Sequence, residues 1–444
     1  MSRDRTMSRD CLRWNTAAVM TASPGPRITS ADLPALRRRI SAVLIGSQIL
    51  GGLGVAVGIA LAPVLAAEVS GSEALSGLAP TASVAGTALL SLPLAALMTS
   101  RGRRAGLVLA YLIGALGAFL VVTASVVGSF PLLLLGMAGF GAGSSANLQA
   151  RFAAADLAEP ERRGRAISTV IWATTIGSVL GPNIAAPASR VFQGTFVPET
   201  AGPFAWAVVI FLLTGTVVAV LLRPDPLLTA RALAPEDTTA AASRSLRAGI
   251  AVVRATPMAR LALVTVAVSH TVMVSVMVMT PVHLGHHGAD IQLIGLVISG
   301  HIAGMYALSP VMGWLSDRVG RLPVIGLAAG LLCCAAVLAG TSGDGHTRTA
   351  AGLFVLGLGW SAGLVAGSAL LTDSVPQAAR AAVQGLSDLT MNSAAGIGGA
   401  VAGVIVSRLG YGWLNAVAAC LLLPMAALTL RRAVAPRSPD SAKA

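Results

Sequence analysis

Runs of about 20 apolar residues recur along this chain, and they constrain its fold more than any other feature. An α-helix needs a run of that length to cross the ~30 Å hydrocarbon layer of a membrane. Twelve such runs occur, at residues 40–67, 76–98, 105–127, 130–153, 164–187, 203–223, 258–281, 291–313, 321–340, 349–372, 382–408 and 411–431. The sequence therefore predicts an all-α membrane protein with twelve transmembrane helices.

The composition supports a membrane protein and argues against a nucleic-acid partner. Hydrophobic residues make up 55% of the chain and charged residues 11%, which lies outside the range of soluble proteins. The net charge is +13, but the arginines lie in short connectors between apolar runs, where they orient helices. An aromatic content of 4% leaves few side chains for base stacking. The lipid bilayer is the expected environment.

The placement of arginine predicts the orientation of the chain. Arginines gather in the connectors after the second, fourth, eighth and tenth runs, and are sparse in the opposite connectors. The first group includes Arg101, Arg103, Arg104, Arg162, Arg163, Arg165, Arg318, Arg321 and Arg380, whereas the opposite connectors hold Arg190, Arg348 and Arg408. Because positive charge marks the cytoplasmic side, both termini are expected there, with the protein in the plasma membrane of a bacterium.

A polar connector at residues 224–257 divides the runs into two bundles of six, at residues 40–223 and 258–432. Residues 1–39 are polar and Arg-rich and predict a disordered cytoplasmic tail, with residues 433–444 as a second tail. Within the first tail, Met7 and Met20 could each begin the protein. The four cysteines show no metal-ligand spacing and predict neither a disulfide framework nor a zinc ribbon.

The two halves contain similar sequence segments at equivalent positions. The segment Met-Thr-Ser-Arg-Gly-Arg-Arg at residues 98–104 corresponds to Ser-Asp-Arg-Val-Gly-Arg-Leu at residues 316–322. Internal repeats of this kind mark transporters whose substrate site lies near the midplane between the halves. The sequence therefore predicts a transporter with a central site.

Thioether and imidazole side chains repeat at helical spacing in the seventh and eighth runs. Met273 and Met277 are four residues apart, as are His301 and Met305, so each pair shares one face of a helix. Two thioethers with a histidine suit copper, especially Cu(I), better than they suit Mg²⁺, Ca²⁺ or Mn²⁺. The alternative is that methionine fills gaps in an apolar core. His270 extends the first stripe and is a possible auxiliary ligand or a satisfied core histidine.

A segment after the eighth run resembles the cytoplasmic loop motif of the major facilitator superfamily, and the resemblance covers residues 40–432. It implies two pseudo-symmetric six-helix bundles that work by alternating access. An Asp near a helix N-terminus with arginines across the loop forms a charge-assisted latch. We therefore expect a cytoplasmic gate made by the motif residues Gly313, Asp317, Arg318, Gly320 and Arg321.

The first-half counterpart of this motif is incomplete. Gly102 and the arginines after it are present, but Thr99 and Ser100 stand where the family has Asp and Arg. On the fifth run, a second segment resembles the glycine-proline motif of proton-coupled exporters. For its residues Gly177, Gly181 and Pro182, close helix packing is the favoured explanation.

The paired MxxxM and HxxxM motifs resemble the CcoA-like branch of the superfamily, which are bacterial copper importers. The resemblance implies Met273, Met277, His301 and Met305 as ligands of a transported copper ion. The same branch includes relatives that resemble riboflavin transporters, so membership alone does not settle the substrate.

Further titratable residues lie in and between these runs. Asp388, on the eleventh run, is a carboxylate within the membrane, and its role is either proton coupling or a helix-packing hydrogen bond. His283, His286 and His287, in the connector after the seventh run, either gather metal at the outer mouth or are simply solvated.

Taken together, these features predict a monomeric secondary transporter that imports copper by alternating access, with copper as cargo and no permanently bound cofactor. No nucleotide-binding GxxxxGK[ST] loop, HExxH or GxSxG segment occurs, so no enzyme activity is expected. The first alternative is a proton-coupled transporter of a small organic solute such as a drug or vitamin. The second is a membrane metal receptor that binds copper without transporting it.

Overall fold

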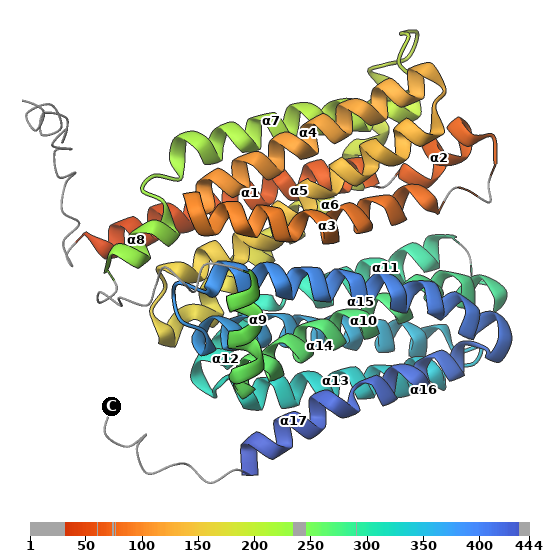
Figure 1. Ribbon diagram of the computed structural model, residues 1–444. Coiled ribbons are helices and arrows are strands. Elements are labelled where there is room, and N and C mark those ends of the chain that lie inside the picture. The colour runs from red at the N-terminus through yellow and green to blue at the C-terminus, as the bar shows by residue number, and fades with distance from the viewer. Residues whose placement is uncertain are drawn as a thin grey trace, which may run out of the picture.

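The chain folds into a two-halved bundle of helices, described by a computed structural model (Figure 1). The structure describes residues 32–59, 61–72, 75, 77–233, 246–289 and 291–434. The first half contains α1 (Leu33–Ile59), α2 (Ala62–Ser70), α3 (Leu78–Arg101), α4 (Arg103–Val127), α5 (Phe130–Asp156), α6 (Arg163–Arg190) and α7 (Gly202–Leu221). The second half contains α10 (Pro257–His286), α11 (Ile291–Tyr306), α12 (Ser309–Arg318), α13 (Arg321–Gly340), α14 (His346–Ser374), α15 (Arg380–Leu409), α16 (Tyr411–Leu421) and α17 (Leu423–Val434).

The predicted all-α fold is confirmed, since the described residues form helices and turns but no strand. Three of the twelve predicted runs are each divided into two helices, α1 and α2, α11 and α12, and α16 and α17. A proline lies in the first turn after each break, at Pro63, Pro310 and Pro424. Proline lacks the backbone N–H that a continuous helix would use there, so the helix restarts at each of these positions.

The N-terminal tail was predicted to extend to residue 39, but the first helix begins before that residue. Helix α1 begins at Leu33, so residues 33–39 are helical and only residues 1–31 lie outside the described part of the chain. The side chain of Arg37 fixes this first turn, because its Nε donates to the carbonyl of Leu157 at 2.8 Å and its guanidinium pairs with Glu159. The predicted C-terminal tail, apart from the end of α17, also falls outside the described residues.

Each half has its own apolar core, and the halves meet along two pairs of helices. Helix α3 packs against α15, and α6 packs against α11 and α12. These pairs are equivalent under the exchange of the two halves, as expected for internal repeats. The central space that they enclose is therefore lined by helices from both halves.

Ten segments of the described residues are long and apolar enough to cross a membrane. The two remaining predicted runs form α5 and α6, which have 27 and 28 residues and are long enough to span. Their hydropathy is lower because they contribute polar side chains such as Asn147, Arg151 and Thr174 to the interior. The outer faces of other helices expose apolar side chains, including Leu89 and Val404, as lipid-facing surfaces do.

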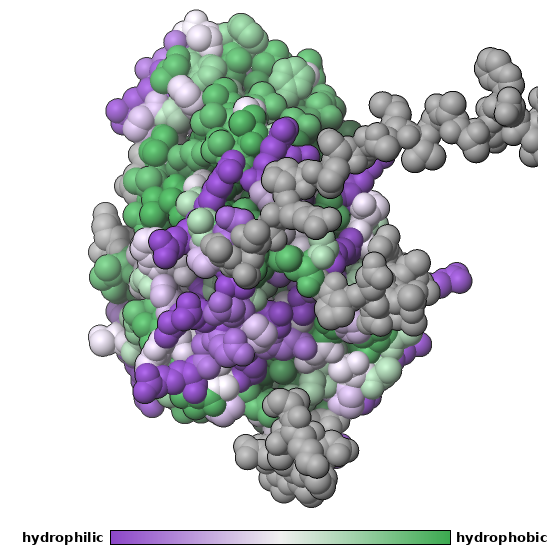
Figure 2. All heavy atoms as spheres, turned by 90° about the vertical axis from the view of Figure 1, so that its left-hand side faces the viewer, coloured by the Kyte–Doolittle hydropathy of each residue, from purple (hydrophilic) through white to green (hydrophobic). Residues whose placement is uncertain are grey.

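The start of α1, the end of α17 and the two short helices of the connector between the halves lie at one end of the bundle (Figure 1), here called the linker end. This connector contains two short helices, α8 (Pro226–Leu233) and α9 (Leu246–Ala255). Figure 2 looks onto the linker end and shows hydrophilic residues gathered across it, with hydrophobic surface beside them. The arginine-rich connectors all lie at this end because successive helices alternate in direction.

Candidate functional site

A cavity of about 440 Å³ lies between the two halves. It is lined by α1, α3, α5 and α6 from the first half and by α10, α11, α14 and α15 from the second. A volume of this order accommodates a small organic molecule. Because both halves contribute to its walls, a rocking motion of one half against the other would change access to it.

One wall of the cavity is aromatic and rich in thioethers. Met273, Met277, Met305, Tyr306 and Trp360 all line it. The rings of Tyr306 and Trp360 meet edge to face, with centroids 5.5 Å apart. Flat, polarizable surfaces of this kind favour contact with the face of a ring.

The facing wall carries a small number of polar side chains from α1, α5 and α6. Gln48 donates from Nε2 to the hydroxyl of Thr174 at 2.7 Å. Asn147 accepts from the hydroxyl of Tyr111 at 3.0 Å. Arg151 completes the polar wall, and its side chain is only 1% exposed. Few and fixed polar groups on an otherwise apolar surface are typical of a site that orients one solute.

The predicted copper ligands do not all face this cavity. The three methionines Met273, Met277 and Met305 line it, but His301 does not. His301 is fully buried, and its Nδ1 donates to the carbonyl of Leu353 on α14 at 2.8 Å. Its Nε2 therefore carries a lone pair, and that atom has no partner. The structure brings the thioethers together and places the imidazole on another face of α11.

The reason lies in the contact between α11 and α14. A Cβ added to Gly357 would lie 2.5 Å from the carbonyl oxygen of His301 and 3.0 Å from Gly304. These glycines let the two helices approach closely, which turns the face of α11 that carries residues 301 and 304 toward α14. The cavity face of α11 instead carries Ile298, Ile302 and Met305.

The possible auxiliary histidines occupy two different places. His270 lines the cavity, and its Nδ1 accepts a hydrogen bond from the indole nitrogen of Trp360 at 2.8 Å. Neutral His270 then carries its proton on Nε2 and offers no lone pair to a metal. His283 stacks on Tyr411 with centroids 4.2 Å apart. It lies at the end of the bundle opposite the linker end, beyond the last turns of the membrane-spanning part of α10.

The other two connector histidines do not complete a metal site around His283. His286 is exposed, while Nδ1 of His287 donates to the carbonyl of His283 at 2.7 Å. Asp290, in the same connector, lies outside the described residues. Among the residues that the structure describes, no group of three or more His, Cys, Asp or Glu side chains could hold a metal ion.

Asp388 lies at the interface between the two halves, called the seam here, on the side of the cavity nearer the linker end. Its Oδ1 pairs with Nη2 of Arg151 at 2.6 Å, and its Oδ2 accepts from Nε2 of Gln149 at 2.7 Å. Both partners belong to α5, whereas Asp388 belongs to α15, so this buried ion pair joins the two halves. One turn further on α15, Asn392 lines the cavity and donates to the carbonyl of Asp388.

A second set of polar contacts joins the halves at the linker end. Both carboxylate oxygens of Asp317 accept from backbone amides at the start of α6, those of Gly164 and Arg165, at 2.8 Å each. Arg321 pairs with Asp317 and with Asp373, its Nε lying 3.1 Å from the latter. The carboxylate of Asp317 thus caps a helix of the opposite half. Its role as a gate stays a prediction.

The remaining motif residues lie around this contact. Gly313 faces α6, where an added Cβ would lie 2.0 Å from Oγ of Ser168. Gly320 has φ +108°, a conformation that favours glycine, and turns the chain into α13. Arg318 lies over the ring of Trp314 at 5.4 Å and takes no part in the contacts described above.

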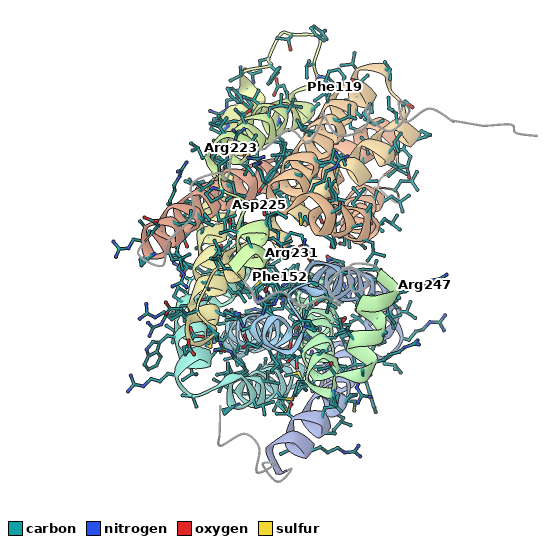
Figure 3. All side chains as sticks on the ribbon, turned by 60° about the vertical axis from the view of Figure 1, so that its left-hand side comes forward. Phe119, Phe152, Arg223, Asp225, Arg231 and Arg247 are labelled. Carbon is teal, nitrogen blue, oxygen red and sulfur yellow. The ribbon has the colours of Figure 1, made fainter. Side chains whose placement is uncertain are left out.

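The incomplete motif of the first half is supplemented by Asp225, which lies just before α8. Its Oδ2 accepts from the backbone amide of Arg104, and its Oδ1 accepts from Leu227 at the start of α8. Arg231, on α8, donates to the carbonyl of Thr99 at 2.7 Å. Figure 3 shows Asp225 and Arg231 together at the linker end. An acid from outside the motif therefore holds the first-half loop.

The glycines of the exporter-like motif pack α6 against α1. An added Cβ at Gly177 would lie 2.6 Å from the backbone nitrogen of Leu53, and one at Gly181 would lie 2.3 Å from Cβ of Ala56. Pro182 follows within the same helix. These positions account for the small residues by close helix contact.

Sequence reasoning missed the aromatic wall and the place of Arg151. Trp360 lies between Gly357 and Gly363 in a segment whose other residues are small apart from Leu358, and one large ring in such a segment could have indicated a cavity. Tyr306 directly follows Met305, the last residue of the HxxxM pair. Arg151, near the end of the fourth apolar run, lies both in the seam and on the cavity wall.

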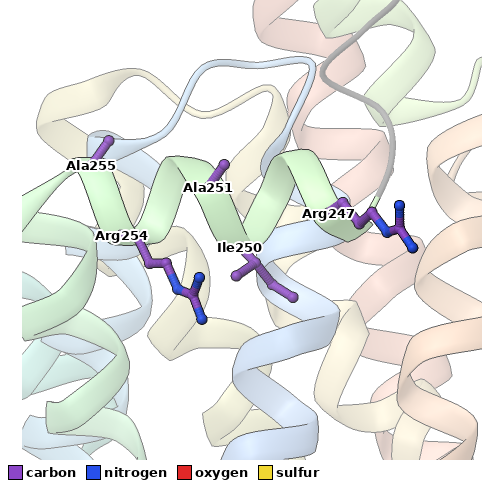
Figure 4. Close-up of a pocket in the computed structure, with 5 residues that line it drawn as sticks. All are labelled: Arg247, Ile250, Ala251, Arg254 and Ala255. Carbon is purple, nitrogen blue, oxygen red and sulfur yellow. The ribbon is translucent and has the colours of Figure 1, made fainter.

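A second hollow lies along α9 and is lined only by that helix (Figure 4). Arg247, Ile250 and Arg254 belong to it. Walls from a single helix cannot enclose a solute. The central cavity is therefore the better candidate site.

Comparison with known proteins places this geometry in a family. The sequence matches the Major Facilitator Superfamily over residues 44–290 and 261–444. It is 36% identical to YddS, an uncharacterized MFS-type transporter of Bacillus subtilis, with 89% of this chain and 92% of YddS covered. It is 28% identical to the riboflavin transporter RfnT of Brucella anthropi, with 90% and 96% covered. The resemblance to CcoA-like copper importers finds no support in these comparisons.

The fold matches a solved structure at lower sequence identity. The proton:xylose symporter XylE, bound to 6-bromo-6-deoxy-D-glucose, superposes with a TM-score of 0.70 at 15% identity, with 90% of this chain and 96% of XylE covered. At that identity the match concerns the fold alone.

Proposed function

Since the chain belongs to the major facilitator superfamily, we propose that this secondary transporter carries a small planar organic solute through its central cavity by alternating access. The observation that supports this solute class is the cavity wall itself. Tyr306 and Trp360 offer ring surfaces beside the thioethers, while the opposite wall offers fixed hydrogen-bonding groups. A planar ring can pack against the aromatic wall while polar groups on its edge form hydrogen bonds with the opposite wall.

The riboflavin transporter RfnT is a relative whose name states a solute of this kind, a planar heterocycle. Because the identity is 28%, we infer from it a solute class, with riboflavin as the representative member that the tests below use. The volume of the cavity, about 440 Å³, is compatible with a solute of that size.

Asp388 is proposed to couple transport to protons. As a carboxylate it holds Arg151 across the seam, and as a neutral acid it would lose the charge that attracts the guanidinium. Protonation would therefore loosen the contact between the halves. The arginine-rich linker end is taken as cytoplasmic, which places both termini inside the cell.

Copper import is the second candidate, favoured by one arrangement. Three thioethers, Met273, Met277 and Met305, line the same cavity, and the free lone pair of His301 lies on the same helix as Met305. A rotation of α11 would be needed to bring His301 to the methionines. The organic solute is preferred because it uses the cavity walls as they stand.

Uptake of two solutes by the same cells separates the candidates. We would measure riboflavin, as a representative planar heterocycle, and radioactive copper in bacteria that express the wild-type chain, Trp360→Ala or Met273→Ala at equal abundance. Trp413→Ala, at an exposed tryptophan on α16, and Met258→Ala, at a half-buried methionine that does not line the cavity, serve as controls.

We expect riboflavin uptake above that of vector cells, reduced in Trp360→Ala and unchanged in both controls. Copper uptake that depends on Met273, with no riboflavin uptake, would replace the organic solute by copper. Copper binding by the purified protein without flux would instead indicate a receptor.

A further inference from the structure

Two side chains on the polar wall of the cavity hold buried polar atoms that no group of the protein satisfies. Arg151 uses Nη2 for Asp388, and its Nε and Nη1 have no partner. Gln48 uses Nε2 for Thr174, and its Oε1 has no partner. Among the described cavity-lining residues, these are the two with such atoms. The face of Phe152 also covers part of the Arg151 guanidinium.

These two side chains lie at a similar depth in the bundle. Gly51 on α1 lies directly against Asn147 on α5, because an added Cβ would be 2.5 Å from its Oδ1. From this contact toward the linker end, Gln48 is three residues along α1 and Arg151 is four residues along α5. At about 1.5 Å per residue, they lie ~4.5 Å and ~6 Å below the same point. Both side chains thus line the same cavity at a similar depth, where one solute would contact them.

The unsatisfied groups are of opposite kinds. Arg151 offers N–H donors and Gln48 offers a carbonyl acceptor. Buried donors and acceptors without partners are rare and destabilising in native proteins, so a missing partner is expected at such a site. The complementary group is an edge that carries a C=O beside an N–H, which is a lactam or imide.

We propose that Arg151 and Gln48 recognise the lactam or imide edge of a planar heterocycle, whose ring lies against Trp360 and Tyr306. The ring carbonyl accepts from Arg151, and the ring N–H donates to Gln48. This inference rests on the proposed function, because it specifies which organic solutes the central cavity selects.

A neutral edge fits this site better than an anion. The charge of Arg151 is already balanced by Asp388 at 2.6 Å, and both residues are almost fully buried. A carboxylate or phosphate on the solute would lie near the Asp388 carboxylate. The low dielectric constant there makes the repulsion between the two negative charges strong. A neutral carbonyl accepts from the free N–H groups and leaves the charge balance unchanged.

The test compares two flavins that differ at one atom. Riboflavin keeps the imide N–H, and 3-methylriboflavin replaces it with a methyl group. Binding to the purified full-length protein in lipid nanodiscs is followed by the quenching of flavin fluorescence. A glutamine amide can turn either face to the solute, and blocking only the solute N–H reports which face is used.

The variants are Gln48→Leu and Arg151→Lys, with Gln193→Leu and Arg190→Lys as matched controls at exposed positions. We expect the wild type to prefer riboflavin by roughly tenfold or more, as for loss of a buried hydrogen bond. Gln48→Leu should abolish this preference and keep the binding of 3-methylriboflavin. Arg151→Lys should weaken the binding of both flavins, since Lys retains a charge for Asp388 but lacks the other N–H groups.

Equal binding of the two flavins by the wild type, with no effect of Gln48→Leu, would overturn this inference and leave the proposed function intact. Failure of the folded wild type to bind either flavin would also overturn it. The two-solute uptake assay then decides separately whether the proposed function survives.

Discussion

Replacing Asp388 with alanine should open the linker end of the transporter. The change removes one partner of a buried ion pair whose side chains are 0% and 1% exposed, and it leaves Arg151 charged and unpaired. Breaking a buried pair in this way typically costs about 3–5 kcal/mol. Because the pair joins the two halves, the cost falls on the conformation in which the linker end is closed.

The effect on populations follows from this free energy. A shift of about 3 kcal/mol changes an equilibrium by a factor of roughly 150. If the closed conformation outnumbers the open one by about 99 to 1, the variant would populate the two about equally. Two populations of this size would give two separate distances between labels placed at the linker end.

The assay is a distance measurement by pulsed electron paramagnetic resonance between spin labels at Arg101→Cys and Val319→Cys, two exposed positions at the linker end. The native cysteines are replaced by serine. Asp344→Ala, which removes an exposed Asp at the opposite end, is the matched control. A single unchanged distance in Asp388→Ala would refute the claim that this ion pair holds the halves together.

Other contacts lead to further expectations. Gly313→Leu should separate α12 from α6, because even a Cβ would lie 2.0 Å from Oγ of Ser168. A longer distance between the same spin labels would show this separation. An unaltered distance would mean that this contact does not hold the gate closed. Arg103→Ala should lower the melting temperature strongly, since its fully buried pair with Asp156 is worth about 3–5 kcal/mol when one partner is lost. Arg37→Ala, at a partly exposed pair, should change stability by less than about 1 kcal/mol, and similar melting shifts for both variants would contradict the role of burial.

The sequence predicted the elements of the fold because membranes impose one length on every spanning helix. The apolar runs correspond to helices in each case, and the arginine-rich connectors lie together at the linker end. The breaks before Pro63, Pro310 and Pro424 were not predicted. Hydropathy does not indicate a break within a run that is apolar throughout, although the prolines at these positions could have indicated one.

The face that each helix turns toward the cavity could not be predicted from spacing. Residues four apart on a helix differ by about 40° in direction, so the edge of a cavity can separate them. Met305 falls inside that edge and His301 falls outside it, because Gly304 and Gly357 hold this side of α11 against α14. Contacts with another helix decide the rotation, and the sequence of α11 alone does not contain them.

Arg151 shows the same limit for charged residues. It lies near the inner end of the fourth run and pairs with Asp388 across the seam. Its place on the cavity wall depends on how α5 packs against α1, where Gly51 admits Asn147. Spacing within one helix does not report on that contact.

The central claim is proton-coupled transport of a planar solute through the cavity, and flux into proteoliposomes tests it most directly. The purified chain would be reconstituted, given an inward proton gradient and supplied with riboflavin. We predict accumulation above the external concentration, which an uncoupler abolishes, and exchange without accumulation in Asp388→Asn. A flux of riboflavin no greater than that of empty liposomes, with or without the gradient, would contradict the account.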